Sequence, residues 1–435
     1  MTWLLDSMYA SQEIDMNGRE RLAMTLNHQE PDRVCVDFGA TPVTGIHASA
    51  ISRLRQAVLG NGGYRVKVNE PYQMLGEIDD ELRAAISIDV IGRSGRKTMF
   101  GTVNSDWKPF TLFDGTEVLV SGDFRYTVDN RTGDLLIHPE GDMTAPPSGR
   151  MPKGGYFFDS IVRQEPIDDS RLDPAANLEE FGLLSEEDLA YYREVHEWFA
   201  ARPQLGALLV VPGAAFGDIA LVPAPFLKYP KGIRDVQEWY ISTATRRDYV
   251  YKVFEKQCEI ALQNITTLVE LFGDCVQVVM ITGTDFGTQR GPFISLKAYR
   301  DLFFPFHKQV NDLIHTQSNW KTFIHTCGSV YDLIPHFIEA GFDVLNPVQC
   351  SAAKMDARTL KREFGKDIVF WGGGVDTQKT IAFGTPEEVY REVRERIEIF
   401  APGGGFVFNS VHNVQGNTPT ENMLAMFRAI RDSGH

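Results

Sequence analysis

The sequence has little cysteine, a deficit of positive charge and no long apolar segment. Lys and Arg number 43 against 58 Asp and Glu, so the net charge is −15. That balance excludes nonspecific binding to nucleic acid or to an anionic membrane, because both require a basic surface. No apolar run reaches the ~18 residues of a membrane-spanning helix. Five cysteines in 435 residues are an odd and sparse set, more typical of reduced thiols or metal ligands than of a disulfide framework.

The N-terminal segment does not resemble a secretory signal. Its only apolar patch, Trp3 to Leu5, is short and carries no basic flank. The composition, 43% hydrophobic and 23% charged, is typical of a globular protein. Together with the reduced cysteines, these features predict a cytoplasmic protein.

Eight short runs rich in β-branched and aromatic residues are each followed by a helical pattern or a polar loop. They cover 33–39, 88–91, a run from about 205, a run ending at 282, and then 322–328, 344–349, 368–374 and 404–412. Alternation of strands and helices indicates parallel strands, which need crossover connections. Eight such units predict an α/β fold of the (β/α)₈ TIM-barrel type.

Capping signals mark several of the expected helices. Before the fourth strand, apolar residues recur at helical spacing from Val253 to Val269. Ser295 is a candidate N-cap for a helix that Pro305 must end or kink. Thr385 and Glu388 form a candidate capping box. Thr418 and Pro419 are expected to open the last helix in the same way.

The segment 93–203 interrupts the barrel pattern. Residues 111–141 alternate apolar and polar side chains around DGT and NRTGD turns, which predicts an antiparallel meander inserted after the second strand. An acidic helix is expected over 184–200. The predicted organisation is one barrel domain, 1–435, in which 93–203 forms a β-meander and helical cap over the barrel mouth.

Polar and metal-binding side chains follow the later strands. Catalytic groups of a barrel gather at the C-terminal ends of its strands, so these residues are expected at one site. They are Asp285, Gln289, His325, Cys327, Asn346, Gln349, Cys350, Asp376, Gln378, His412, Asn413 and Gln415. His47, after the first strand, is a further candidate for substrate contact. Asp89, inside a hydrophobic strand, is either a structural acid or, if buried beside the mouth, a functional one.

The pattern His-Thr-Cys at 325–327 places an imidazole and a thiol on one face of a strand, because residues i and i+2 point the same way. Imidazole and thiolate are favoured zinc ligands, and a catalytic zinc needs a third protein ligand and an open position. His412 is the first candidate for that ligand and Cys350 the alternative. The other interpretation of a bare H-x-C pattern is core packing.

Two segments, 17–39 and 412–426, together with these residues, resemble the uroporphyrinogen decarboxylase superfamily. The resemblance implies a (β/α)₈ barrel and one of two activities, porphyrinogen decarboxylation or cobamide-dependent methyl transfer. The decarboxylases carry an Arg-Gln-Ala-Gly-Arg loop after the first strand, whereas the loop here, 38–49, has no arginine. Without that carboxylate clamp, true porphyrinogen decarboxylation is not expected.

The methyltransferase branch binds zinc through His-x-Cys and a cysteine near the C-terminus. His325 and Cys327 match the pair, and His412 stands in place of the last cysteine, six residues before a Thr-Pro. The resemblance therefore implies zinc held by His325, Cys327 and His412. It also implies methyl exchange between a small molecule and a corrinoid. Because the chain has no D-x-H-x-x-G motif, the corrinoid is expected on a separate corrinoid-binding protein.

Roles for the remaining residues follow from this hypothesis. Asp285, Gln289 and His47 are expected in the catalytic machinery, and Asn346, Gln349, Asp376 and Gln378 in substrate binding. The alternative hypothesis is a metal-free decarboxylase or lyase of a small acid, with Asp285 or Asp89 as proton donor. A noncatalytic binding protein is a third class, but it leaves the polar mouth unexplained. Dimers are frequent in the superfamily, so a homodimer is a further expectation.

Overall fold

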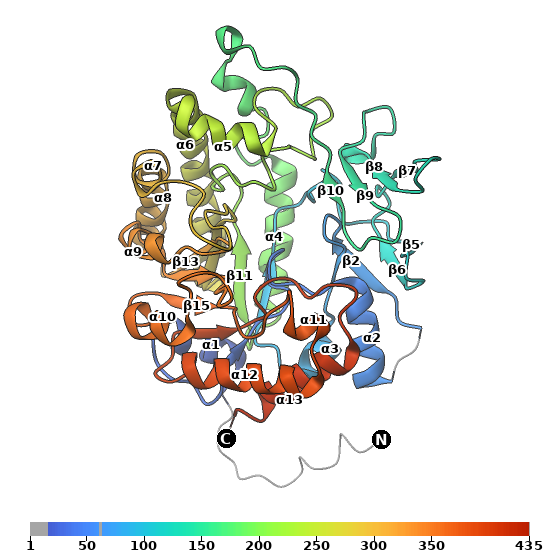
Figure 1. Ribbon diagram of the computed structural model, residues 1–435, viewed down its shortest axis with the longest axis vertical. Coiled ribbons are helices and arrows are strands. Elements are labelled where there is room, and N and C mark those ends of the chain that lie inside the picture. Colours follow the sequence, from blue (N-terminus) through green and yellow to red (C-terminus); the bar gives the residue numbers. More distant parts are fainter. Residues whose placement is uncertain (1–15, 61–62, 435) are drawn as a thin grey trace.

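The computed structural model describes residues 16–60 and 63–434, and its centre is a parallel eight-stranded sheet (Figure 1). The expectation about a signal segment concerns residues outside this described part. The strand order is β1-β16-β15-β14-β13-β12-β11-β4. The strands from β4 to β16 are therefore neighbours in chain order, and the first strand, β1, pairs with the last, β16. The strands are β1 (Cys35–Val36), β4 (Val90–Arg93), β11 (Gly206–Val210), β12 (Val278–Thr282), β13 (Lys321–His325), β14 (Val344–Asn346), β15 (Val369–Trp371) and β16 (Phe406–Phe408). All eight predicted strands are present, and the α/β barrel is confirmed.

Asp89 joins the two ends of the sheet. Its backbone N–H donates to the Val36 carbonyl (2.9 Å), and its carboxylate accepts the Val36 N–H (2.9 Å). The carboxylate also pairs with Arg21 (2.6 Å) and Arg33 (2.7 Å). Asp89 directly precedes β4 and so lies at the N-terminal end of the barrel, opposite the mouth. It is a structural acid, and its expected alternative as a proton donor at the mouth is wrong.

The side chains of the barrel strands point alternately into two apolar cores, one inside the barrel and one between the barrel and the helices. Inside the barrel, Val90, Leu208, Val278, Phe323 and Val407 pack together. The side chains between them in sequence face outward onto the helices, as Ile324 does from β13. This period-two pattern is what directs the side chains at the strand ends either into the barrel mouth or toward the helices.

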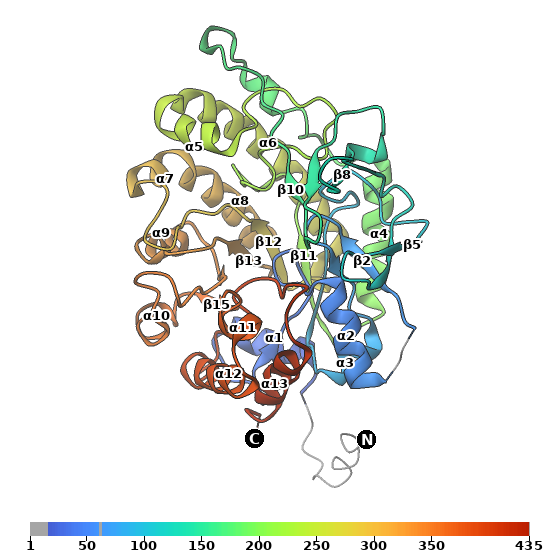
Figure 2. The same ribbon diagram turned by 45° about the vertical axis from the view of Figure 1, so that its right-hand side comes forward.

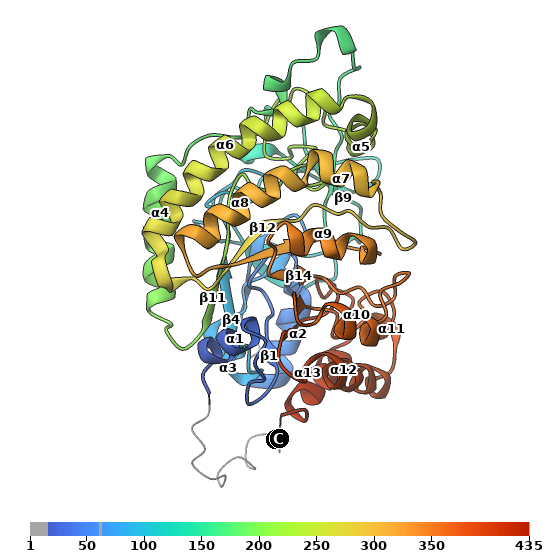
Figure 3. The same ribbon diagram turned by 90° about the vertical axis from the view of Figure 1, so that its left-hand side faces the viewer.

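Helices cover the outside of the barrel, and α6 and α8 lie side by side there (Figure 3). Among the described residues no helix is long and apolar enough to cross a membrane. The helices are α1 (Gly18–Leu26), α2 (Ala48–Leu59), α3 (Asp80–Ala85), α4 (Glu186–Ala200), α5 (Val236–Thr245), α6 (Arg247–Phe272), α7 (Leu296–Leu302), α8 (Phe304–Gln317), α9 (Ile334–Glu339), α10 (Ala357–Phe364), α11 (Thr380–Phe383), α12 (Pro386–Phe400) and α13 (Thr420–Arg431).

Most of the predicted caps are confirmed. Ser295 accepts the Ala298 N–H at the start of α7, and the helix breaks before α8, whose first turn holds Pro305. Thr385 and Glu388 form the capping box of α12. The prediction for Thr418 is wrong, because Pro419 is the N-cap of α13 and the Thr418 hydroxyl is buried without a hydrogen bond.

Two small sheets lie together on one side of the barrel, near α2 (Figure 2). One is an antiparallel sheet in the order β10-β9-β8-β7, and the other has the order β3-β2-β6-β5. Their strands are β2 (Val66–Glu70), β3 (Leu75–Gly76), β5 (Lys108–Thr111), β6 (Glu117–Val120), β7 (Tyr126–Val128), β8 (Leu135–Ile137), β9 (Gly149–Met151) and β10 (Asp159–Ser160).

The expected limits of the insertion need two corrections. First, β2 and β3 precede the second barrel strand, and β2 pairs in parallel with β6, so the small sheets also use residues outside 93–203. Second, the helix expected in the cap, α4, belongs to the ring of helices. Its Tyr192 and Phe199 pack against Phe272 of α6. Long-range pairing and packing of this kind leave no local signal in the sequence.

Candidate metal-binding site

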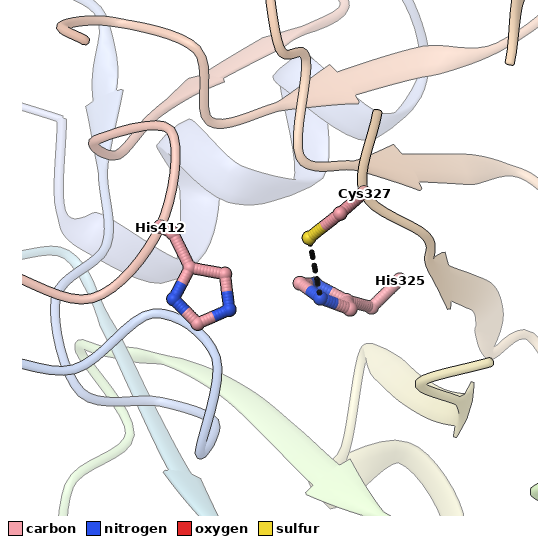
Figure 4. Close-up of side chains that lie close together, drawn as sticks. All are labelled: His325, Cys327 and His412. Atoms are coloured by element: carbon pink, nitrogen blue, oxygen red, sulfur yellow. Dashed lines mark hydrogen bonds between the residues drawn. The ribbon is translucent and has the colours of Figure 1, made fainter. Parts of the chain in front are cut away.

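Three predicted metal ligands, His325, Cys327 and His412, come together at the mouth of the barrel (Figure 4). The Cys327 Sγ lies 3.4 Å from His325 Nε2. The rings of His325 and His412 have centroids 5.4 Å apart at an interplanar angle of 73°. One donor atom of each residue lies within 4.8 Å of the others. These are separations that a single metal ion can bridge.

The barrel strands explain this convergence. His325 ends β13 and continues the inward-facing row that contains Phe323, and Cys327 follows two residues later. His412 comes from the loop after β16, where the Ser410 hydroxyl donates to the His412 carbonyl (2.5 Å). Two segments far apart in the sequence therefore deliver their side chains to the same end of the barrel.

Asn346 fixes which nitrogen of His325 faces the site. The Asn346 Nδ2 donates to the Trp371 carbonyl (2.8 Å), so its Oδ1 must face His325 Nδ1, 2.6 Å away. An amide oxygen only accepts, so Nδ1 carries the imidazole proton and donates it. His325 Nε2, the nitrogen beside Cys327, therefore keeps its lone pair for a metal.

Burial keeps both imidazoles neutral and the thiol protonated when no cation is bound. Burial lowers the pKa of His325 to about 4, although the hydrogen bond to Asn346 opposes the shift. Burial and the nearby His325 lower the pKa of His412 to about 4. Burial, followed by the carboxyl groups of Asp285 and Asp218, raises the pKa of Cys327 well above its ordinary value. Neutral imidazole is the metal-binding form of histidine, whereas the thiol must release its proton to the solvent when a metal binds.

Two carboxyl groups border the three ligands. Asp285 Oδ1 accepts the Cys327 backbone N–H (2.7 Å) and lies 4.0 Å from His325 Nε2. Burial raises the pKa of Asp285. Asp218 accepts the Ala220 N–H (2.9 Å), and burial raises its pKa to about 6. The two imidazoles and one thiol form a donor set that suits zinc, with a negatively charged border.

Residues 227–433 match the family profile described as Uroporphyrinogen decarboxylase (URO-D). The chain carries a URO-D family domain. The matched range contains all three clustered side chains and Asp285 but excludes the two small sheets. The resemblance noted from the sequence is thereby confirmed, and the residues of the candidate site belong to the URO-D domain.

A methyltransferase from Methanosarcina mazei has a similar structure, with a TM-score of 0.52. It is 14% identical, and the alignment covers 96% of this chain and 99% of the other. At that identity the likeness shows a shared fold along the whole chain. No curated protein matches the sequence.

The structure separates the two candidates for the third ligand. His412 belongs to the cluster of donor atoms with His325 and Cys327, and Cys350 does not. Burial raises the pKa of Cys350 to about 11, and the charges that act on it most are those of Arg396 and Glu392 on α12. The geometry therefore favours His412.

His47 has a structural position. Its Nδ1 accepts the Ser49 N–H at the start of α2 (3.1 Å), so its Nε2 donates to the Tyr156 carbonyl (2.8 Å). With both ring nitrogens engaged, His47 has no free nitrogen for proton transfer. It instead holds the loop that contains Tyr156 against the barrel, in place of the catalytic role expected for it.

The four residues expected to bind substrate, together with Gln289, occupy different positions. Asn346 is buried and holds His325. Gln349 is buried and accepts the Gly328 N–H (2.9 Å), which fixes the turn after Cys327. Asp376 accepts the N–H groups of Gln378 and Lys379 and so shapes its own loop. Gln378 and Gln289 are exposed at the surface. Asn346 and Gln349 thus support the site through hydrogen bonds to His325 and to the turn after Cys327.

Sequence reasoning missed Asp218 and Tyr240. The hydroxyl of Tyr240, from α5, donates to the Asp285 carbonyl (2.6 Å). Asp218 lies in the loop after β11, and the rule that polar residues after barrel strands line the mouth applies to it as well. Tyr240 left no such signal, because it reaches the site from a helix.

Proposed function

We propose that this protein is a zinc-dependent methyltransferase that exchanges a methyl group between a small molecule and a corrinoid. The convergence of His325, Cys327 and His412 at the barrel mouth carries this proposal. A catalytic zinc takes three protein ligands and keeps one position open. The shared fold with a methyltransferase supports the proposal. The corrinoid would come from a separate protein, since the chain has no D-x-H-x-x-G motif.

The chain's own side chains would prepare the reaction. When bound, zinc lowers the pKa of a thiol or water, or polarises a heteroatom, so that a reactive anion exists at neutral pH. His325, oriented by Asn346, presents its free Nε2 to the site, and Cys327 supplies a thiolate. Asp285, whose Oδ1 lies 4.0 Å from His325 Nε2, borders the site. Because methyl transfer is an in-line displacement at carbon, the protein contributes mainly alignment.

A metal-free decarboxylase or lyase is the second candidate. The buried carboxyl groups of Asp285 and Asp218 at the mouth favour it, because burial suits a carboxyl group to proton donation. Asp89, the other acid expected to serve such a reaction, lies at the opposite end of the barrel in ion pairs with Arg21 and Arg33. Metal binding distinguishes the two candidates.

The test is elemental analysis of protein purified without a histidine tag. The expected result is about one zinc per chain. Cys327→Ala and His412→Ala should each lower that content, while circular dichroism shows that both variants remain folded. Wild-type protein that holds no zinc and takes none up would overturn the proposal and favour the decarboxylase or lyase.

A further inference from the structure

Asp285 approaches the three donor atoms from a separate segment, the loop after β12. Its Oδ1 lies 4.0 Å from His325 Nε2, the same nitrogen that faces Cys327. The charge of Asp285 also acts on both Cys327 and His412. All three candidate ligands therefore lie within the electrostatic reach of this one carboxylate.

The carboxylate of Asp285 accepts the Cys327 N–H (2.7 Å) but, among the described residues, has no lysine or arginine partner. Its side chain is 22% exposed, and among residues 16–60 and 63–434 the basic group beside it is His325, which burial keeps neutral. Nearby Asp218 adds a second negative charge. A mostly buried carboxylate is expected to pair with a cation or to coordinate a metal.

The local backbone holds Asp285 in place. The Tyr240 hydroxyl donates to its carbonyl, and the next residue, Phe286, donates its N–H to Thr326 Oγ1 (2.9 Å). The Cys327 N–H binds Oδ1. An ionised carboxylate has about four lone-pair sites, so this one hydrogen bond leaves the group able to bind a further partner. A carboxylate held in this way needs little rearrangement to bind a metal.

We infer that Asp285 is the fourth ligand of the metal before substrate arrives, and that a thiol or oxygen substrate displaces it. This inference rests on the proposed function. When a thiol binds, one metal–oxygen bond breaks and one metal–sulfur bond forms, and the thiol proton is released to the solvent. The carboxylate keeps the site closed to other ligands until substrate competes for the position.

Cobalt-loaded protein reports on both Asp285 and the added thiol as ligands. The absorption of Co²⁺ depends on its coordination, and binding of a thiolate adds a charge-transfer band. The probes are Zn²⁺ in competition with a chelator, and 2-mercaptoethanol titrated into the Co²⁺ form. Asp285→Asn is the main variant, since asparagine keeps an oxygen for the Cys327 N–H but supplies no anionic ligand. Asp285→Ala is the second. Asp218→Asn controls for the loss of a negative charge near the site.

Loss of the Asp285 carboxylate should weaken the binding of metal and strengthen the binding of thiol. In both Asp285 variants, metal affinity should fall about 10-fold or more, since loss of a residue that only supports a metal ligand already costs about 10- to 100-fold. In the same variants, 2-mercaptoethanol should bind several-fold more tightly. Asp218→Asn should leave the Co²⁺ spectrum unchanged. A purely structural role for Asp285 would weaken both kinds of binding together.

Three results would overturn the inference. The first is an unchanged metal affinity and Co²⁺ spectrum in both Asp285 variants. The second is weaker thiol binding in them, which would make Asp285 a substrate-positioning residue. The third is an Asp218→Asn spectrum that changes as much as that of Asp285→Asn. Wild-type protein that binds neither Zn²⁺ nor Co²⁺ would instead overturn the proposed function itself.

Discussion

His325 Nδ1 lies 2.6 Å from Asn346 Oδ1, and the two residues are register partners on the neighbouring strands β13 and β14. The Asn346 amide continues to the carbonyl of Trp371 on the next strand, β15. Three adjacent strands of the barrel thus fix the orientation of one imidazole. The direction of the metal-binding lone pair is set by the register of the sheet.

Replacing Asn346 should therefore weaken metal binding without removing a ligand. Asn346→Ala is expected to lower zinc affinity about 10- to 100-fold, because His325 loses the acceptor that fixes its proton on Nδ1. Asn346→Asp, which restores an acceptor at the same place, should recover much of that loss. Competition with a chromophoric chelator measures both. Equal affinity in wild type and Asn346→Ala would show that the hydrogen bond has no such role.

Cys350 should be dispensable for metal binding. Because His412, rather than Cys350, lies beside His325 and Cys327, Cys350→Ser should retain the zinc content of the wild type. Cys327→Ser is the matched variant and should lose most of it. Elemental analysis of the two proteins, prepared side by side, gives the answer. A zinc content that falls only in Cys350→Ser would reverse the ligand assignment.

Removal of the Asp89 carboxylate should destabilise the barrel without affecting the mouth. Asp89→Asn removes the carboxylate that Arg21 and Arg33 share, although Arg21 keeps its ion pair with Asp32, and it weakens the junction with Val36. The expected loss is roughly 3 kcal/mol in the free energy of unfolding, as for a broken buried ion pair. Urea denaturation followed by circular dichroism measures it. Zinc content should stay at the wild-type level, and its loss would argue against a purely structural role.

Asp343 should make the protein sensitive to acid. It accepts from His315 (2.7 Å) and the Thr322 N–H (2.8 Å) and pairs with Lys321 (3.2 Å). Burial acts to raise the pKa of Asp343, but these partners outweigh it, and the pKa is lowered. A carboxylate with a lowered folded-state pKa stabilises the protein above its unfolded pKa of about 3.9. That stabilisation is lost as pH falls through the folded-state value.

The variant Asp343→Asn removes this contribution. It should be less stable than wild type by about 2 kcal/mol at pH 7, since hydrogen bonds to a charged group are lost. The difference should shrink as the pH falls below about 4. Urea denaturation at a series of pH values compares the two proteins. A stability difference that is constant from neutral pH to pH 3 would contradict the assignment.

The ligand pattern was visible in the sequence where a local rule applied. His325 and Cys327 share a face because strand side chains alternate, and His412 follows a strand that ends at the same edge of the barrel. Such rules predict where a side chain lies but not which groups it contacts there. Asn346 and Gln349 were expected to contact substrate, yet hydrogen bonds across the sheet make them supports for His325 and for the turn after Cys327.

The sequence by itself determined the eight strands, most of the helix caps and the set of donors at the barrel mouth, because each depends on short-range spacing and on residue chemistry. Only the tertiary structure decided that His412 rather than Cys350 joins the cluster, that Asp285 faces it, and that Asp89 closes the opposite end. It also decided that β2 pairs with β6 and that α4 packs on α6. Those outcomes depend on contacts between segments far apart in the chain, which no local pattern encodes.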